Sequence, residues 1–70
     1  MGKFPGINHL QAVKAFQRAG FEIVRQSGHI LMSDGSRTIV IPRNDPINAF
    51  TMYKIVQGAG LTVEQFRDLL

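Results

Sequence analysis

The sequence predicts a single α+β domain with the element order α-β-β-β-α and a short third helix at the C-terminus. Apolar residues recur at helical spacing in one segment towards each end of the chain, whereas the segments between them alternate apolar and polar residues as strands do. Short Gly-containing turns separate these alternating segments, so the strands should form a three-stranded antiparallel meander. The helices have apolar stripes to bury, and we expect them on one face of the sheet.

The first helix is expected to follow a lead-in over residues 1–7. Asn8 is a suitable N-cap residue, and Gln11 three positions later completes a capping-box pattern. Gly20 is the expected C-cap. The residues expected on the apolar face of this helix are Leu10, Val13 and Phe16.

The three strands are expected at residues 21–26, 29–33 and 37–41. In the first strand, strict alternation places Phe21, Ile23 and Arg25 on one face. Ser27-Gly28 should make the first turn, because Gly and Ser permit a bend that few other residues permit. Asp34-Gly35-Ser36 is a strong hairpin signal, and Pro42 is expected to end the third strand.

The second helix should begin near Asn48 and end at Gly58 and Gly60. Its expected apolar stripe consists of Ala49, Met52, Tyr53 and Val56. Thr62 with Gln65 forms another capping box, which opens the short third helix through to Leu70. Phe66 and Leu69 give this helix an apolar side. Met32, Met52 and the phenylalanines are expected in the core.

Composition limits the class of protein. Seventy residues make one domain, 1–70, and the absence of cysteine excludes disulfides and cysteine zinc sites. No run approaches the length of a membrane span, so we expect a cytoplasmic protein without a membrane partner. Residues 1–43 carry six basic and two acidic side chains, whereas residues 44–70 carry two basic and three acidic ones. This asymmetry, within a net charge of +3, suits a polyanion such as RNA.

Several short motifs then occur in a defined order: Gly20-Phe21, Arg25-Gln26-Ser27-Gly28-His29, a hairpin, Ile39-Val40-Ile41-Pro42, and a helix ending in Gly60-Leu61-Thr62. Over roughly residues 7–68 the chain resembles the HicA (YcfA-like) family of toxins from type II toxin–antitoxin pairs. The family reads Gly-Ser-His where this chain reads Ser27-Gly28-His29. It often carries a second histidine shortly after the proline, where Arg43 and Asn44 stand here, and a Gly-Thr-Leu opening of the second helix, which appears here as Phe50-Thr51-Met52.

This resemblance implies a fold like that of double-stranded RNA-binding domains and an mRNA interferase activity. It also implies a HicB-like antitoxin as the protein partner, and His29 as the catalytic group. We expect the His29 ring to stand exposed at the head of its strand, where an imidazole can exchange protons near neutral pH. His9, in the first helical turn, is expected to be simply solvated.

RNA cleavage needs a base for the 2′-hydroxyl, an acid for the leaving oxygen and positive charge at the phosphorus. Beside His29, the candidate substrate-binding residues are Arg25, Ser27, Gly28, Arg37, Thr51 and Lys54. The amides of Gly28 and His29 could form an anion nest, and Thr51 could hold a phosphate with the amides of its helix. The carboxylates stand apart and the two histidines are twenty positions apart, so we expect neither a metal site nor a small-molecule cofactor.

The order α-β-β-β-α leaves a second hypothesis open, which is a non-catalytic module that binds RNA or a partner protein. Double-stranded RNA-binding domains grip phosphates with a lysine-rich start to the last helix. Here that start is Asn48-Ala49-Phe50-Thr51, which contains no lysine. A degenerate family member that only binds a partner protein is the remaining alternative.

Overall fold

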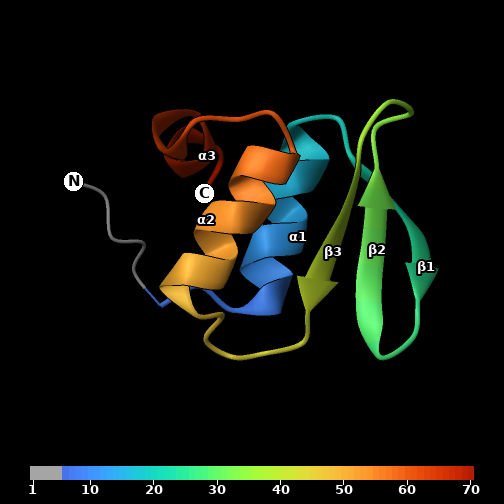
Figure 1. The fold of residues 1–70 in the computed structure, drawn as a ribbon, viewed down its shortest axis with the longest axis horizontal. Coiled ribbons are helices and arrows are strands. Elements are labelled where there is room, and N and C mark those ends of the chain that lie inside the picture. The colour runs from blue at the N-terminus through green and yellow to red at the C-terminus, as the bar shows by residue number, and fades with distance from the viewer. Residues whose placement is uncertain (1–5) are drawn as a thin grey trace.

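The computed structural model describes residues 6–70 and has the predicted α+β architecture (Figure 1). Its elements are α1 (His9–Arg18), β1 (Glu22–Gln26), β2 (His29–Ser33), β3 (Thr38–Pro42), α2 (Ala49–Gly58) and α3 (Val63–Leu69). The predicted element order is therefore confirmed. Residues 1–5 of the expected lead-in, which include Phe4, lie outside the described residues.

The strands form an antiparallel sheet in the order β1-β2-β3, which confirms the predicted meander. One face of the sheet is buried in the core and carries Ile30, Met32, Ile39 and Ile41. Leu31 and Val40 pair with each other on the opposite face, where Val40 is 45% exposed. The helices therefore cover one face and leave the other open, and α1 and α2 both contact β3 (Figure 1).

Aromatic contacts in the core join α1 to α3. The ring of Phe16 in α1 lies 4.9 Å from that of Phe66 in α3 and 5.8 Å from that of Phe21, measured between centroids. All three rings are at most 2% exposed, so these contacts fix the short third helix against α1. Within residues 6–70, no helix combines the length and apolar character needed to cross a membrane.

The helix boundaries follow the predicted caps. Asn8 and Thr62 each complete the capping box expected of them, and the Asn48 side chain accepts two amide hydrogen bonds at the start of α2. The C-cap residues are Ala19 in α1 and Ala59 in α2, so the prediction of Gly20 as the C-cap of α1 is off by one residue. Gly20 and Gly60 directly follow these caps and have positive φ angles. These positions favour glycine, which has no Cβ to clash in the left-handed region.

The predicted alternation of β1 is wrong after Ile23. A β-bulge lies between Ile23, which pairs with Met32, and Arg25, which pairs with Leu31. The extra residue, Val24, shifts the remainder of the strand by one position. Arg25 therefore shares the open face with Leu31, not the core face with Ile23. The third strand also lies one residue later than predicted, because Pro42 still pairs with His29.

Three predictions about the helix faces are also wrong. Leu10 of α1 is 60% exposed, and the buried residues of that helix are Ala12, Val13, Ala15 and Phe16. In α2 the buried residues are Met52, Ile55 and Val56, whereas Ala49 and Tyr53 are exposed. Phe50 is 66% exposed and so departs from the expectation that the phenylalanines lie in the core.

Candidate functional site at one end of the sheet

His29 opens β2 at the end of the sheet that also holds the β1–β2 turn and the last residue of β3 (Figure 1). Its backbone pairs with Pro42, and its side chain is exposed. Because the next residue, Ile30, is buried on the core face, alternation places His29 on the open face with Leu31. The expectation that this imidazole stands exposed at the head of the strand is confirmed.

The turn before His29 is tied to the segment that follows β3. The Ser27 amide donates to the carbonyl of His29 at 3.0 Å, and Arg43 Nε donates to the carbonyl of Ser27 at 3.1 Å. The Arg43 guanidinium therefore lies beside the histidine turn. Sequence reasoning noted Arg43 only as the replacement of a second histidine, although its place directly after Pro42 was the available signal.

The turn at Ser27-Gly28 was expected to need the conformational freedom of glycine, but Gly28 does not use it. Its φ is not positive, and a Cβ built at Gly28 would meet nothing within 4 Å. The bend therefore does not require glycine, and that part of the prediction is wrong. Ser27, Gly28 and His29 are all exposed, so the turn is open to a ligand.

The two predicted arginines lie in different places. Arg25 pairs with Leu31, two positions along β2 from His29, on the same open face. Arg37 precedes β3 at the opposite end of the sheet, and a Cβ placed on Gly60 would come within 2.9 Å of its guanidinium. The length of β2 separates the two ends by about 13 Å. The structure thus brings Arg25 towards His29, but not Arg37.

Thr51 and Lys54 lie in α2. The Asn48 side chain accepts from the amides of Phe50 at 2.8 Å and of Thr51 at 3.3 Å. Those two amides are already engaged, so the idea that they hold a phosphate together with Thr51 loses its basis. The ammonium of Lys54 lies 4.9 Å from the centroid of the Phe50 ring, on an exposed face of the helix.

His9 is paired, which contradicts the expectation that it is simply solvated. Its Nδ1 lies 2.8 Å from Oδ1 of Asp45, and its backbone amide donates to the same oxygen at 2.9 Å. Only 17% of the His9 side chain is exposed. These contacts, first the backbone amide and then the ring, hold the pKa of Asp45 below its usual range. Sequence alone gave no signal for a contact across 36 positions.

The His9–Asp45 pair fastens the loop after β3 to the start of α1. The Ile47 amide donates to the carbonyl of Ile7 at 2.7 Å and strengthens the same attachment. Both the loop and the start of α1 lie at the end of the molecule that carries the β1–β2 turn (Figure 1). These contacts hold the backbone that follows Arg43, and the Arg43 guanidinium itself is held by its hydrogen bond to the Ser27 carbonyl.

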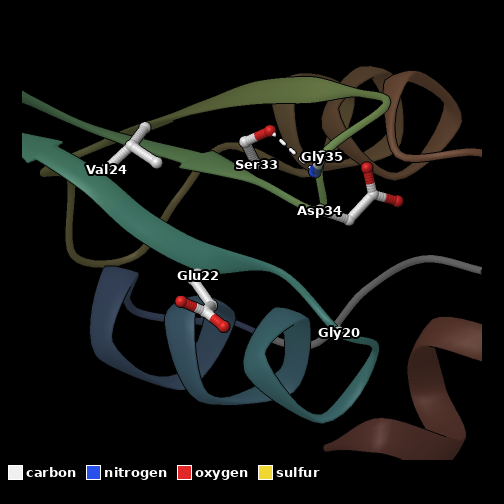
Figure 2. Close-up of a pocket in the computed structure, with 6 residues that line it drawn as sticks. All are labelled: Gly20, Glu22, Val24, Ser33, Asp34 and Gly35. Atoms are coloured by element: carbon white, nitrogen blue, oxygen red, sulfur yellow. Dashed lines mark hydrogen bonds between the residues drawn. The ribbon is translucent and has the colours of Figure 1, made fainter.

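A hollow of about 340 Å³ lies at the other end of the sheet. Figure 2 shows its lining residues, Gly20, Glu22, Val24, Ser33, Asp34 and Gly35. The lining includes two carboxylates and no basic side chain, which disfavours a polyanion there. Asp34 is also engaged, because its carboxylate accepts from the amides of Ser36 and Arg37. The end of the sheet that carries His29 has exposed cations nearby, so it is the better candidate for binding RNA.

Within residues 6–70 no group of three or more His, Cys, Asp and Glu side chains is arranged to hold a metal ion. No known family model matches the chain, and a search of curated proteins found no match.

Proposed function

We propose that this chain is a metal-independent endoribonuclease that cleaves mRNA, acting as the toxin of a type II toxin–antitoxin pair. The proposal includes a fold like that of double-stranded RNA-binding domains and a HicB-like antitoxin as inhibitor. The observation that carries it is the exposed imidazole of His29 on the open face, with the Arg43 guanidinium bound to the adjoining turn. The resemblance in the sequence around Ser27-Gly28-His29 supports the same activity.

In this mechanism His29 removes the proton from a ribose 2′-hydroxyl. The 2′-oxygen then bonds to the adjacent phosphorus, and the bond from phosphorus to the 5′-oxygen breaks. The leaving 5′-oxygen takes a proton from water, His29 later gives up its proton to solvent, and the products are a 2′,3′-cyclic phosphate and a 5′-hydroxyl. The proposal assigns stabilisation of the phosphorane, which is more negative than the ground state, to the charges of Arg43 and Arg25. Arg43 binds the Ser27 carbonyl, and Arg25 shares the open face with His29.

Incubation of the purified chain with single-stranded RNA in EDTA tests this function. We expect cleavage with 2′,3′-cyclic phosphate ends, and His29→Ala should reduce the rate about 10²- to 10⁴-fold, the usual contribution of an acid–base group. Thr38→Ala is a matched control, because Thr38 is exposed at the far end of the same sheet. Cleavage by His29→Ala at the parent rate would contradict the proposed role.

A second candidate function is binding of a partner protein without catalysis, and the open sheet face favours it. Val40, which pairs with Leu31 on the open face, is 45% exposed, and Val24 in the bulge of β1 is 59% exposed. Apolar side chains on an open face mark a surface that a partner can cover. An absence of cleavage together with a stable complex with a HicB-like protein would support this function in place of the first.

A further inference from the structure

One face of α2 carries an unusual amount of exposed aromatic surface. Phe50 is 66% exposed and Tyr53 is 43% exposed. Tyr53 and Lys54 come three and four positions after Phe50, and residues at this spacing are neighbours on a helix surface. We call these three residues, Phe50, Tyr53 and Lys54, the aromatic patch.

Contacts within α2 hold the patch in place. The Lys54 ammonium lies 4.9 Å from the centre of the Phe50 ring, a cation–π distance. The hydroxyl of Tyr53 accepts from Nε2 of Gln57 at 3.0 Å. Two thirds of the Phe50 surface remains exposed although Lys54 lies over the ring. The ring therefore has free surface on which a planar group of a ligand can stack.

We propose that the aromatic patch is a stacking site for an unpaired nucleobase, and that the RNA bound by this chain is single-stranded. This inference rests on the proposed function and names its substrate class. A base would stack on the Phe50 ring with Tyr53 at its side, while Lys54 contacts a neighbouring phosphate. Such stacking accepts every base, because each has a π-face.

Charge and position favour RNA over a protein as the occupant. The α2 sequence, AFTMYKIVQG, contains no acidic residue, so the only charged side chain of that helix is the patch lysine. The start of α2 lies at the same end of the molecule as the β1–β2 turn (Figure 1). An RNA strand that contacts both the patch and His29 would have to pass around this end of the molecule, because α2 packs on the core side of the sheet and His29 stands on the open face.

Duplex RNA does not fit this site as well as a single strand. In a duplex the bases are stacked on one another and present only their edges, so an aromatic side chain cannot stack on them. The start of α2 also lacks the lysines with which a duplex-binding domain contacts phosphates. A flexible single strand can turn one base outward onto Phe50.

The test measures RNA binding in the His29→Ala background, where the oligonucleotide is not consumed. Fluorescence anisotropy with a labelled single-stranded RNA of mixed sequence gives the Kd. Phe50→Ala should weaken binding about 5- to 150-fold, the range for loss of one base stack. Phe50→Leu should lose nearly as much, because leucine keeps the apolar bulk without the π-face. Leu10→Ala is the matched control, since Leu10 is 60% exposed on the other main helix.

Equal affinity of Phe50→Ala and its parent for single-stranded RNA would overturn the stacking site. Equal losses from Phe50→Ala and Leu10→Ala would also overturn it. Full RNA affinity in Phe50→Leu would overturn it too, because leucine has no π-face on which a base can stack. Duplex of the same sequence should bind more weakly, and its affinity should not respond to Phe50→Ala. Cleavage by the unmodified chain, measured separately, tests the proposed function, so failure of the two ideas can be distinguished.

Discussion

The two turns that flank β2 use their residues in opposite ways. At the hairpin end of the sheet, the Asp34 carboxylate accepts from the amides of Ser36 and Arg37, and Ser33 Oγ accepts from the amide of Gly35. Gly35 has a φ of 95°, a value that side chains rarely tolerate. Each residue of this turn therefore contributes to the shape of the turn itself.

At the histidine end, the turn Ser27-Gly28 has fewer internal contacts. One backbone hydrogen bond closes it, and Arg43 from a distant segment contacts its carbonyl. Gly28 has no positive φ, and its surroundings are empty. The side chains of Ser27 and Gly28 are therefore not needed to form their turn, and such a turn can bind a ligand. The Asp34-Gly35-Ser36 hairpin has a similar composition, but its residues are needed for the shape of the turn.

The largest contrast should appear when an arginine is removed at each end. Arg43→Gln should lower RNA cleavage about tenfold or more, the effect of losing one charge-assisted hydrogen bond to a phosphate. Arg37→Gln should change it far less, because Arg37 lies at the hairpin end against Gly60. Single-turnover cleavage assays with thermal unfolding controls would measure both. Equal losses from the two variants would remove the distinction between the two ends.

Replacing each of the two turn glycines, Gly35 and Gly28, with alanine should change the free energy of unfolding in opposite directions. Gly35→Ala forces a Cβ into the left-handed region and should lower the free energy of unfolding by about 1–2 kcal/mol. Gly28→Ala should raise it by about 0.4–1 kcal/mol, because alanine restricts only the unfolded chain there. Urea titration of the two variants at one temperature gives the comparison. A destabilised Gly28→Ala would mean that this turn also depends on its glycine.

The sequence was sufficient for the elements that local chemistry determines. The capping boxes at Asn8 and Thr62 and the hairpin at Asp34-Gly35 were predicted because their hydrogen bonds join residues at most three positions apart. The exposed position of His29 followed equally from the turn directly before it. Each of these features depends on a few neighbouring residues and on no distant part of the chain.

Tertiary contacts account for what the sequence could not show. The bulge at Val24 is invisible in an alternating pattern, because only pairing with β2 reveals the extra residue. Rotation of α2 on the core decided that Ile55, not Tyr53, is buried, although both fit a helical stripe. The contacts of Arg43 with Ser27 and of His9 with Asp45 span 16 and 36 positions, so the candidate site was only partly predictable.

The smallest effect should come from the two engaged aspartates, one near each end of the sheet. Hydrogen bonds from the Arg37 and Ser36 amides lower the pKa of Asp34, and those from His9 lower the pKa of Asp45. A carboxylate whose pKa falls on folding stabilises the native state above its unfolded pKa, and this contribution disappears as the pH drops through the folded value. We therefore expect stability to fall with acid below about pH 4.

Asp34→Asn and Asp45→Asn should each reduce the pH dependence of the free energy of unfolding. The double variant should reduce it by the sum of the two effects. Additivity is expected because the two carboxylates lie at opposite ends and share no hydrogen-bonding partner. Urea midpoints measured from pH 6 to pH 3 would give the three slopes. If the pH dependence of the double variant were no smaller than that of either single variant, the two ends would be coupled through the sheet. The contrast between a self-contained hairpin and an independent histidine turn would then be wrong.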